Sequence, residues 1–327
     1  MDHGILQLTG HSKFVEDCRF SADGSKIVSC GGDGKVFLWE TERGQILNRI
    51  GRHDAETWSC DFSACGTYIC SASSDKTVRI WDERTHGHIA AFQGHTKTVW
   101  SCAFHPDATS FSVASASSDM SVKIWNWKTL SVEQNIENHK NIVENVAFTR
   151  NGETLVTCGR DRTVQIFENY ANALNRKVKL LITHEMRVNH CCFSGQYDEL
   201  VLSCSDDKTV KVWDRNKLIN THTLVGHQNI VWGCDGFMLN DAMIVISCSS
   251  DKTLRFWDIT SEKELKTMRK MTEDVESEAQ LHSCHISPNL TQIAVCSNNG
   301  NLYLIETRLI FQEIHNALES QQDENPN

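Results

Sequence analysis

One pattern recurs about every forty residues and constrains the fold more than any other feature of the chain. Each copy has a His, an Asp about two dozen residues later, and an aromatic residue six positions after the Asp. The Asp-to-aromatic pairs are Asp33/Trp39, Asp75/Trp81, Asp119/Trp125, Asp161/Phe167, Asp207/Trp213 and Asp251/Trp257. Asn299/Ile305 is a decayed seventh copy. A repeat this regular indicates one repeat architecture rather than several unrelated domains.

Length and charge narrow the class of protein. The chain has 327 residues, and the repeat runs from His11 to Ile305, so we expect a single domain. Its 42 acidic and 32 basic side chains give a net charge of −10 with His neutral, which disfavours nucleic acid as the main partner. No apolar run approaches the roughly 20 residues of a membrane span, and the N-terminus lacks a signal-peptide pattern. We therefore expect an intracellular protein, cytoplasmic or nuclear.

Fourteen cysteines raise the question of disulfides or bound metal. Eleven of them occupy two positions that recur from unit to unit. Residues at equivalent positions lie in different units, and the chain has no Cys-x-x-Cys pair, so neither a zinc motif nor a disulfide framework is visible. We interpret the cysteines as small buried hydrophobic residues in a reducing compartment, and we expect no metal and no cofactor.

The second unit shows how one repeat is expected to fold. Residues 58–62 alternate polar and apolar side chains, 68–72 are rich in apolar residues, and 77–81 carry β-branched residues at alternate positions. These patterns are typical of strands, and a fourth strand is expected at 89–92. One such sheet cannot bury both of its faces, whereas radial stacking about an axis covers each face with a neighbour. Seven units therefore predict an all-β propeller.

Two dipeptides occupy regular places in the repeat. The Gly-His pairs begin at Gly10, Gly94 and Gly226, and the Trp-Asp pairs begin at Trp81, Trp213 and Trp257. Over nearly the whole chain, this pattern resembles the WD-repeat β-propeller family. The stretch from Asp33 to Gln45 is similar to small members of the family that consist of WD repeats alone. The resemblance implies a single seven-bladed β-propeller of four-stranded antiparallel blades.

The two ends of the chain are expected to behave differently. We expect the propeller to span residues 1–307. Residues 4–8 resemble the outer strand that precedes a Gly-His pair, so we expect this N-terminal strand to complete blade seven and close the ring. Residues 309–314 are the alternative for that edge. We expect a partly disordered C-terminal tail at 308–327, because residues 319–327 are polar.

Each unit also has a Ser or Thr four residues before the turn Asp, which together with the His could be read as a catalytic triad. Six copies argue against this, because a nucleophilic site needs one exposed hydroxyl with its own oxyanion hole. A chain of hydrogen bonds from Trp through hydroxyl and His to Asp instead pairs buried polar groups in each blade, and the resemblance implies such a structural network. Its complete copies are His11, Ser29, Asp33 and Trp39; His53, Ser71, Asp75 and Trp81; His95, Ser115, Asp119 and Trp125; His184, Ser203, Asp207 and Trp213; and His227, Ser247, Asp251 and Trp257.

Two blades depart from this network. The fourth has Phe167 in place of Trp, and the seventh has Val295, Asn299 and Ile305 and no matching His. With the long charged insert at 268–279, blade seven is expected to be the loosest part of the ring. Because all candidate catalytic groups are periodic, we expect no enzyme activity.

The resemblance implies that function lies on the narrow top face around the channel, where the repeats differ. In the family this face is lined by the residue after the first strand's buried Val and by the residue before the turn Asp. From these positions we expect a partner to be bound by Glu16, Trp58, Trp100, Glu144, Arg160, Asn189, Trp232 and His282. Arg160 is the residue before the turn Asp in the fourth blade. In the other six blades the same position, which precedes Asn299 in the seventh, is occupied by Gly32, Ser74, Ser118, Asp206, Ser250 and Asn298. Three Trp residues with charges of both signs suit a peptide or a partner's loop, although these Trp residues could instead mainly pack between blades.

A second signal gives an alternative function. Residues Trp81 to Arg84 resemble the Trp-Asp-x-Arg motif by which some family members dock on the adaptor of cullin-RING ubiquitin ligases, with the Arg carrying the contact. The chain would then be a substrate receptor. Four residues that begin with an obligatory Trp-Asp also arise by chance. We expect a monomeric subunit of a larger complex that binds protein or peptide rather than membrane, and the sequence does not identify the partner.

Overall fold

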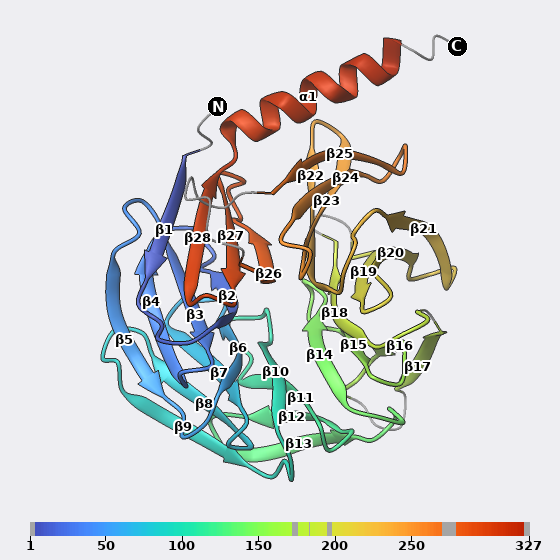
Figure 1. The fold of residues 1–327 in the computed structure, drawn as a ribbon. Coiled ribbons are helices and arrows are strands. Elements are labelled where there is room, and N and C mark those ends of the chain that lie inside the picture. The colour runs from blue at the N-terminus through green and yellow to red at the C-terminus, as the bar shows by residue number, and fades with distance from the viewer. Residues whose placement is uncertain (1–3, 172–175, 183, 195–197, 270–278, 324–327) are drawn as a thin grey trace.

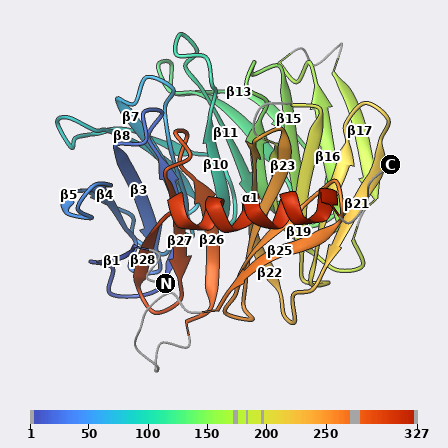
Figure 2. The same ribbon diagram turned by 90° about the horizontal axis from the view of Figure 1, so that it is seen from above.

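The computed structural model describes residues 4–171, 176–182, 184–194, 198–269 and 279–323. Within these ranges the chain forms seven four-stranded antiparallel sheets, arranged as blades around a central axis, and one helix (Figure 1). The predicted seven-bladed, all-β propeller is confirmed. In the view from above, α1 lies across the outside of the ring (Figure 2).

Each of the first six blades uses four consecutive strands, and the innermost strand comes first. Blade one is β2 (Val15–Phe20), β3 (Lys26–Gly31), β4 (Lys35–Glu40) and β5 (Ile46–Arg52). Blade two is β6 (Thr57–Phe62), β7 (Tyr68–Ser73), β8 (Thr77–Asp82) and β9 (His88–Gln93). Blade three is β10 (Val99–Phe104), β11 (Ser112–Ser117), β12 (Val122–Asn126) and β13 (Ser131–Ile136).

The next three blades repeat this order. Blade four is β14 (Val143–Phe148), β15 (Thr154–Gly159), β16 (Thr163–Glu168) and β17 (Lys177–Ile182). Blade five is β18 (Val188–Phe193), β19 (Leu200–Ser205), β20 (Thr209–Asp214) and β21 (Ile219–Val225). Blade six is β22 (Val231–Leu239), β23 (Ala242–Ser249), β24 (Leu254–Asp258) and β25 (Lys263–Met268).

Blade seven joins the two ends of the propeller. It consists of β26 (Leu281–Ile286), β27 (Gln292–Ser297), β28 (Asn301–Glu306) and, as the outermost strand, β1 (Ile5–Thr9). Ile5 lies opposite Ile305 and Thr9 lies opposite Asn301 in the antiparallel pair. The N-terminal strand therefore closes the ring as predicted and pairs the edge of β28. Most of the insert expected to loosen this blade, residues 270–278, lies outside the described residues.

The C-terminal segment differs from its expected form. Residues 308–323, which the sequence places in a partly disordered tail, form helix α1 (Arg308–Asp323). The alternative of an edge strand at 309–314 is wrong for the same reason. Residues 324–327 lie outside the described residues.

Packing explains why this segment is helical. Ile310 and Ile314 lie four residues apart, on one face of α1, and both are fully buried against blades six and seven. Phe311 stacks on Phe237 of β22 with ring centroids 5.2 Å apart. The polar composition of the last residues concealed this apolar helical stripe.

In blades one to six, the turn between the second and third strands depends on the repeated Asp, and Asn299 takes its place in blade seven. In blade two the Asp75 carboxylate accepts the backbone N–H of Thr77 at 3.0 Å, and Lys76 between them has a φ of 70°. The corresponding residues Gly34, Met120, Arg162, Lys208, Lys252 and Gly300 also have positive φ. An Asp side chain that bonds the backbone two residues on stabilises such a turn, which accounts for one role of the repeated Asp.

Apolar clusters between neighbouring blades form the core. One cluster, for example, joins Ile80 and Phe92 of blade two to Val113 and Trp125 of blade three. Glycine in the Gly-His pair allows this stacking. A Cβ atom on Gly10 would lie only 2.8 Å from the Trp39 ring.

Candidate functional site

The repeated Ser, His, Asp and Trp form a buried chain of hydrogen bonds. In blade two the Trp81 indole N–H donates to Ser71 Oγ at 2.8 Å, Ser71 Oγ lies 2.8 Å from His53 Nε2, and His53 Nδ1 lies 2.8 Å from Asp75. Because an indole can only donate, the Ser hydroxyl is free to donate to Nε2, which leaves Nδ1–H to donate to the carboxylate. Blades one, three, five and six repeat the chain.

Burial and hydrogen bonding set the protonation state of these groups. Burial raises the pKa of Asp75, but the hydrogen bonds from His53 and Thr77 outweigh it and hold the pKa well below its usual range. Burial lowers the pKa of His53, so the ring is neutral at pH 7. The Ser71 side chain is fully buried, as are its equivalents, and is not accessible as a nucleophile.

Two blades satisfy their polar groups in another way. In blade four Thr157 still bonds His139, at 2.7 Å, and the buried Phe167 needs no acceptor. In blade seven Asn299 replaces the turn Asp and donates to the hydroxyl of Tyr303 at 3.0 Å. Tyr303 is fully buried and was not singled out from the sequence, because its position is occupied by Phe, Lys, Arg or Gln in the other units.

A β-bulge shapes the top face. In each innermost strand the pairing register shifts immediately after the first buried residue, for example between Val99 and Ser101 of β10. The residue that the shift leaves out of register is Glu16, Trp58, Trp100, Glu144, Asn189, Trp232 or His282 in the respective blades. A bulge re-aims the side chain that it contains. These residues, which the sequence indicated for the top face, therefore leave the blade core together.

A second ring of residues orients this first ring. The indole N–H groups of Trp58, Trp100 and Trp232 donate to hydroxyl groups 2.7, 2.6 and 2.8 Å away. The acceptors are Ser74, Ser118 and Ser250, each the residue before its turn Asp. The three Trp residues are only partly buried. They are thus held in place by side-chain hydrogen bonds while part of each ring stays exposed.

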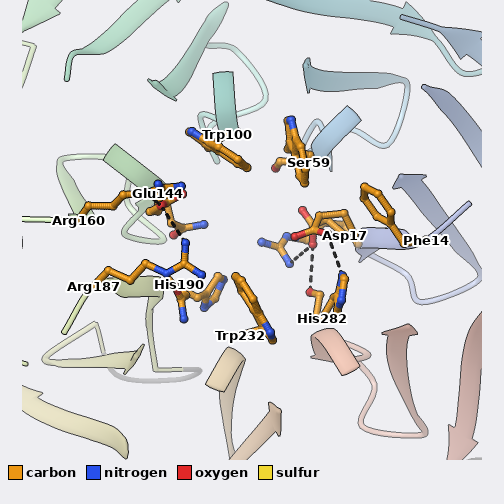
Figure 3. Close-up of a pocket in the computed structure, with 16 residues that line it drawn as sticks. Phe14, Asp17, Ser59, Trp100, Glu144, Arg160, Arg187, His190, Trp232 and His282 are labelled. Carbon is orange, nitrogen blue, oxygen red and sulfur yellow. Dashed lines mark hydrogen bonds and ion pairs between the residues drawn. The ribbon is translucent and has the colours of Figure 1, made fainter. Parts of the chain in front are cut away.

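All eight predicted partner-binding residues line one cavity of about 340 Å³ at the mouth of the channel (Figure 3). One wall is aromatic: Trp58 lies 4.5 Å from Trp100 and 5.7 Å from Phe14 between ring centroids. Trp232 stands on another side, next to His282. Phe14 was not predicted, since it precedes the buried Val and has no repeated identity.

Charged groups complete the wall between Trp100 and Trp232. Arg160 lies over the Trp100 ring at 5.6 Å and Arg187 over the Trp232 ring at 4.9 Å. Glu144 pairs with Arg160 at 2.5 Å and with Arg187 at 4.0 Å. Burial raises the pKa of Glu144, while the two arginines oppose that shift. The cavity therefore offers aromatic faces beside charges of both signs.

The floor of the cavity comes from residues that follow the bulge. Asp17 accepts hydrogen bonds from Arg19 at 3.3 Å and from Ser283 at 3.2 Å, and Ser283 belongs to the last blade. Burial, with the positive charge of Arg19, lowers the pKa of His190 to about 3, so this ring is neutral. These residues are not repeated between blades, and sequence spacing alone did not connect them.

Comparison with known proteins agrees with this architecture. A family model described as the IFT122 first beta-propeller matches residues 14–306 of the chain. The chain belongs to this family of WD-repeat β-propellers. WD-repeat propellers are in general protein-interaction scaffolds rather than enzymes.

Several individual proteins are similar to this WD-repeat propeller. The U5 small nuclear ribonucleoprotein 40 kDa protein of Dictyostelium discoideum is 29% identical over 230 residues, which cover 70% of this chain and 51% of the relative. Nuclear distribution protein nudF of Aspergillus niger is 34% identical over 103 residues, covering 31% of this chain and 23% of the relative. WD repeat-containing protein 1 of Xenopus tropicalis is 39% identical over 59 residues, which cover 16% of this chain and 10% of the relative. The chain thus spans about half the length of the first relative and less of the others. The finer likeness to small members made of WD repeats alone stays a prediction.

Arg84 lies apart from the top cavity of the WD-repeat propeller. Strand β8 starts beside the top rim and ends at Asp82 on the opposite face. Asp82 accepts the backbone N–H groups of Arg84 and Thr85 at 2.9 and 2.8 Å, which shapes the turn and leaves the Arg84 side chain exposed.

Among the described residues, none forms a helix with the length and apolar character needed to cross a bilayer.

Proposed function

We propose that the chain is a non-catalytic protein-interaction scaffold that binds a peptide or a loop of a partner protein in the cavity on its top face. The observation that carries this proposal is the ring of bulge residues. Trp58, Trp100 and Trp232 are oriented by hydrogen bonds and still partly exposed around one cavity. Oriented aromatic residues with low side-chain entropy are the anchors that dominate protein interfaces.

The size and chemistry of the cavity favour a short segment of protein. A volume of about 340 Å³ lies at the lower end of ligand cavities, and suits one or two inserted side chains. The aromatic wall from Phe14 to Trp100 would receive an apolar or planar side chain. Arg160, Arg187 and His282 supply hydrogen-bond donors at the rim for the carbonyl or carboxylate groups of a bound chain.

The test compares full-length protein with a variant that carries Trp58→Ala and Trp100→Ala. Trp127→Ala is the matched control, because Trp127 is also partly exposed but lies away from the top cavity. Proteins captured from cell extract are quantified, and the affinity of each dependent partner is then measured with purified components. We expect the double variant to lose partners that the control keeps, with at least a tenfold weaker affinity, about 1.4 kcal/mol.

Folding must be separated from binding in this experiment. Far-ultraviolet circular dichroism and thermal unfolding report whether the double variant keeps its blades. If it unfolds, Arg160→Ala with Arg187→Ala probes the same cavity from its charged side. A folded top-face variant that keeps every partner at unchanged affinity would overturn the proposal.

A second candidate function rests on Arg84. Its side chain is exposed on the face opposite the cavity, so docking on a cullin-RING adaptor would leave the top face open for a substrate. The proposal predicts that purified adaptor binds the chain and that Arg84→Ala abolishes the binding. Arg84→Lys should also weaken it, because Lys lacks the bidentate geometry of Arg. Lys128→Ala in blade three is the matched control, and a wild-type chain that shows no adaptor binding rules this function out.

The state of the cysteines bears on where the protein acts. All fourteen cysteines are free, and twelve of them are buried. So many unpaired thiols are typical of a reducing compartment, which supports a protein of the cytosol or nucleus. Localisation of a tagged full-length chain in cells tests this, and secretion into the medium would contradict it.

A further inference from the structure

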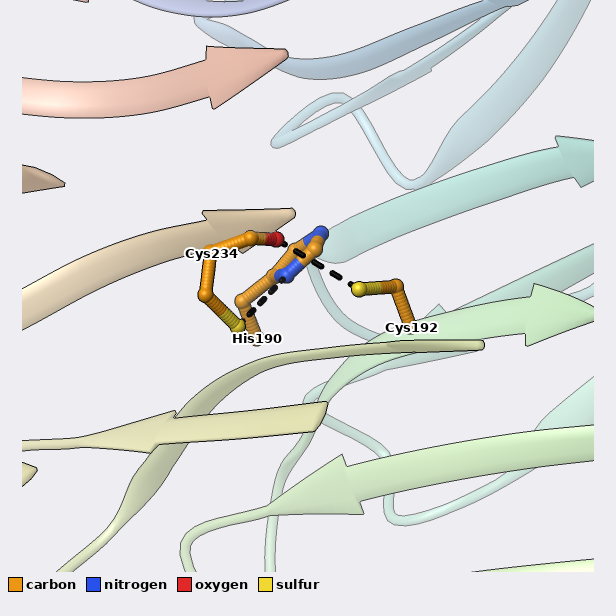
Figure 4. Close-up of side chains that lie close together, drawn as sticks. All are labelled: His190, Cys192 and Cys234. Carbon is orange, nitrogen blue, oxygen red and sulfur yellow. Dashed lines mark hydrogen bonds between the residues drawn. The ribbon is translucent and has the colours of Figure 1, made fainter. Parts of the chain in front are cut away.

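Three potential metal ligands from two neighbouring blades meet beside the channel (Figure 4). His190 and Cys192 belong to β18, and Cys234 belongs to β22. Their ligand atoms all lie within 4.8 Å of one another. His190 Nδ1 is 3.8 Å from Cys234 Sγ, and Cys192 Sγ is 3.4 Å from the carbonyl oxygen of Cys234. Within the described ranges of the chain, no other set of three such residues comes this close.

We propose that His190, Cys192 and Cys234 bind one thiophilic metal ion, with Zn²⁺ as the physiological ligand, and that the ion links blade five to blade six. Zn–S bonds of about 2.3 Å and Zn–N bonds of about 2.0–2.1 Å in a tetrahedron place neighbouring ligand atoms roughly 3.5–3.8 Å apart. The His190–Cys234 separation already has this value. Cys192 Sγ would need to move by no more than about 1 Å, which a change in one side-chain torsion provides.

The group is not a product of the repeat alone. Cys234 occupies a repeated position, and Cys residues at the two repeated positions also meet in pairs between other blades, as Cys158 and Cys191 do. His190 and Cys192 are different, because the corresponding residues of blade three are Ser101 and Ala103. Two non-repeated ligands thus stand next to one repeated thiol. A mixed set of two sulfurs and one imidazole favours Zn²⁺ over Mg²⁺ or Ca²⁺, which prefer oxygen ligands.

The surroundings give an ion access and a fourth ligand. His190 and Cys192 line a channel-side cavity of about 270 Å³, together with Arg19, Asp235 and His285. A water molecule in this cavity can complete the tetrahedron, as in three-ligand zinc sites. Neutral His190 is in the form that coordinates a metal, and the two thiols release their protons when the ion binds. Asp235 adds negative charge beside the site, whereas Arg19 opposes a cation and limits its affinity.

Metal binding is tested on the full-length chain, purified under reducing conditions and stripped with a chelator. The probes are Zn²⁺, measured by competition with a chromophoric chelator and by elemental analysis after gel filtration, and Co²⁺, measured by absorption. We expect one Zn²⁺ per chain, visible bands of tetrahedral Co²⁺, and near-ultraviolet thiolate-to-Co²⁺ charge transfer that Zn²⁺ abolishes. We also expect Zn²⁺ to raise the unfolding temperature, since an ion bound only in the folded state stabilises it.

Variants distinguish this site from other thiols. Cys192→Ser and His190→Gln should each weaken Zn²⁺ binding by at least tenfold and abolish the charge-transfer band. Cys248→Ser, which removes a buried thiol of blade six outside the group, should leave both unchanged. Cys192 is only partly buried, so its replacement tests the site even if a change at the deeply buried Cys234 prevents folding. Substoichiometric Zn²⁺, equal binding by Cys192→Ser, or a Cys192–Cys234 disulfide in the reduced preparation would each overturn the proposal.

Discussion

Asn299 donates a hydrogen bond to the hydroxyl of Tyr303 over 3.0 Å, within the blade that has lost the repeated His, Asp and Trp. Ser297 donates to the Asn299 side chain at 2.5 Å, so the turn of blade seven has a polar network of its own. The Tyr303 hydroxyl reaches the turn from the buried face of β28. Blade seven lacks the repeated His, Asp and Trp, which predicted a loose blade. Tyr303, at another position of the same unit, supplies a hydrogen-bond partner in their place.

Replacing Tyr303 by Phe should therefore destabilise the propeller. The change keeps the ring but removes the hydroxyl, and we expect the free energy of unfolding to fall by about 1 kcal/mol, the net value of one hydrogen bond. Urea unfolding followed by fluorescence and circular dichroism measures it. Tyr68→Phe is the control, because the Tyr68 hydroxyl has no hydrogen bond to the described residues. Equal stability of the two variants would mean that the blade-seven network contributes nothing.

Ring closure depends on one buried side chain of the N-terminal strand. Leu8 of β1 is almost fully buried among side chains of blades seven and one. Leu8→Ala should cost about 2–4 kcal/mol, the range for truncating a core Leu. Gln7→Ala changes the exposed neighbour in the same strand and should cost less than about 0.5 kcal/mol. Chemical denaturation of both variants decides the matter, and a Leu8→Ala variant as stable as wild type would contradict closure by β1.

Helix α1 should behave as part of the folded domain. Ile314, on the inner face of the helix, is fully buried against blades six and seven, so Ile314→Ala is expected to lower the free energy of unfolding by about 2–4 kcal/mol. Hydrogen exchange should show protected amides across the helix in the wild type and faster exchange in the variant. Gln312→Ala, on the exposed side of the same helix, serves as the control. Rapid exchange throughout α1 in the wild-type chain would show that the helix is not docked in solution.

The buried carboxylates predict a specific dependence of stability on pH. Burial raises the pKa of Asp161, but the hydrogen bond from His139 outweighs it and lowers the pKa from 3.8 to about 2. The unfolded chain therefore binds more protons than the folded chain between these values, so this stabilisation is complete above about pH 4 and declines as the pH falls towards 2.

A variant isolates this effect from the other titrating groups. Asp161→Asn should reduce stability most at pH 7, and its difference from wild type should shrink as the pH falls below 4, by at most about 1.4 kcal/mol per pH unit. Urea unfolding of both proteins at a series of pH values measures the difference. Asp241→Asn is the control, since Asp241 lies in the exposed turn between β22 and β23, outside the His network. A difference that stays constant from pH 7 to pH 3 would contradict the lowered pKa.

Much of the candidate site was predictable because repeats align. The residue after the buried Val recurs at one place in each unit, and the structure brings all seven such residues to the rim of one channel. Phe14 and the floor residues Asp17 and His190 were missed, since they have no common identity across units. The helical stripe of Ile310 and Ile314 was missed for another reason: its apolar residues lie within a polar segment, and only packing against blades six and seven reveals their role.

The sequence by itself determined the number of blades, their strand order, the buried hydrogen-bond chains and the closing strand. These depend on contacts within one unit or on a period that every unit shares, so local pattern suffices. Tertiary structure alone decided which residues of other blades the non-repeated side chains meet. Ser283 reaches Asp17 across the closure of the ring, and Cys234 reaches His190 across two blades. Such contacts depend on how the blades stack and on the direction in which a bulge points each side chain. The spacing of residues within a single repeat predicts neither.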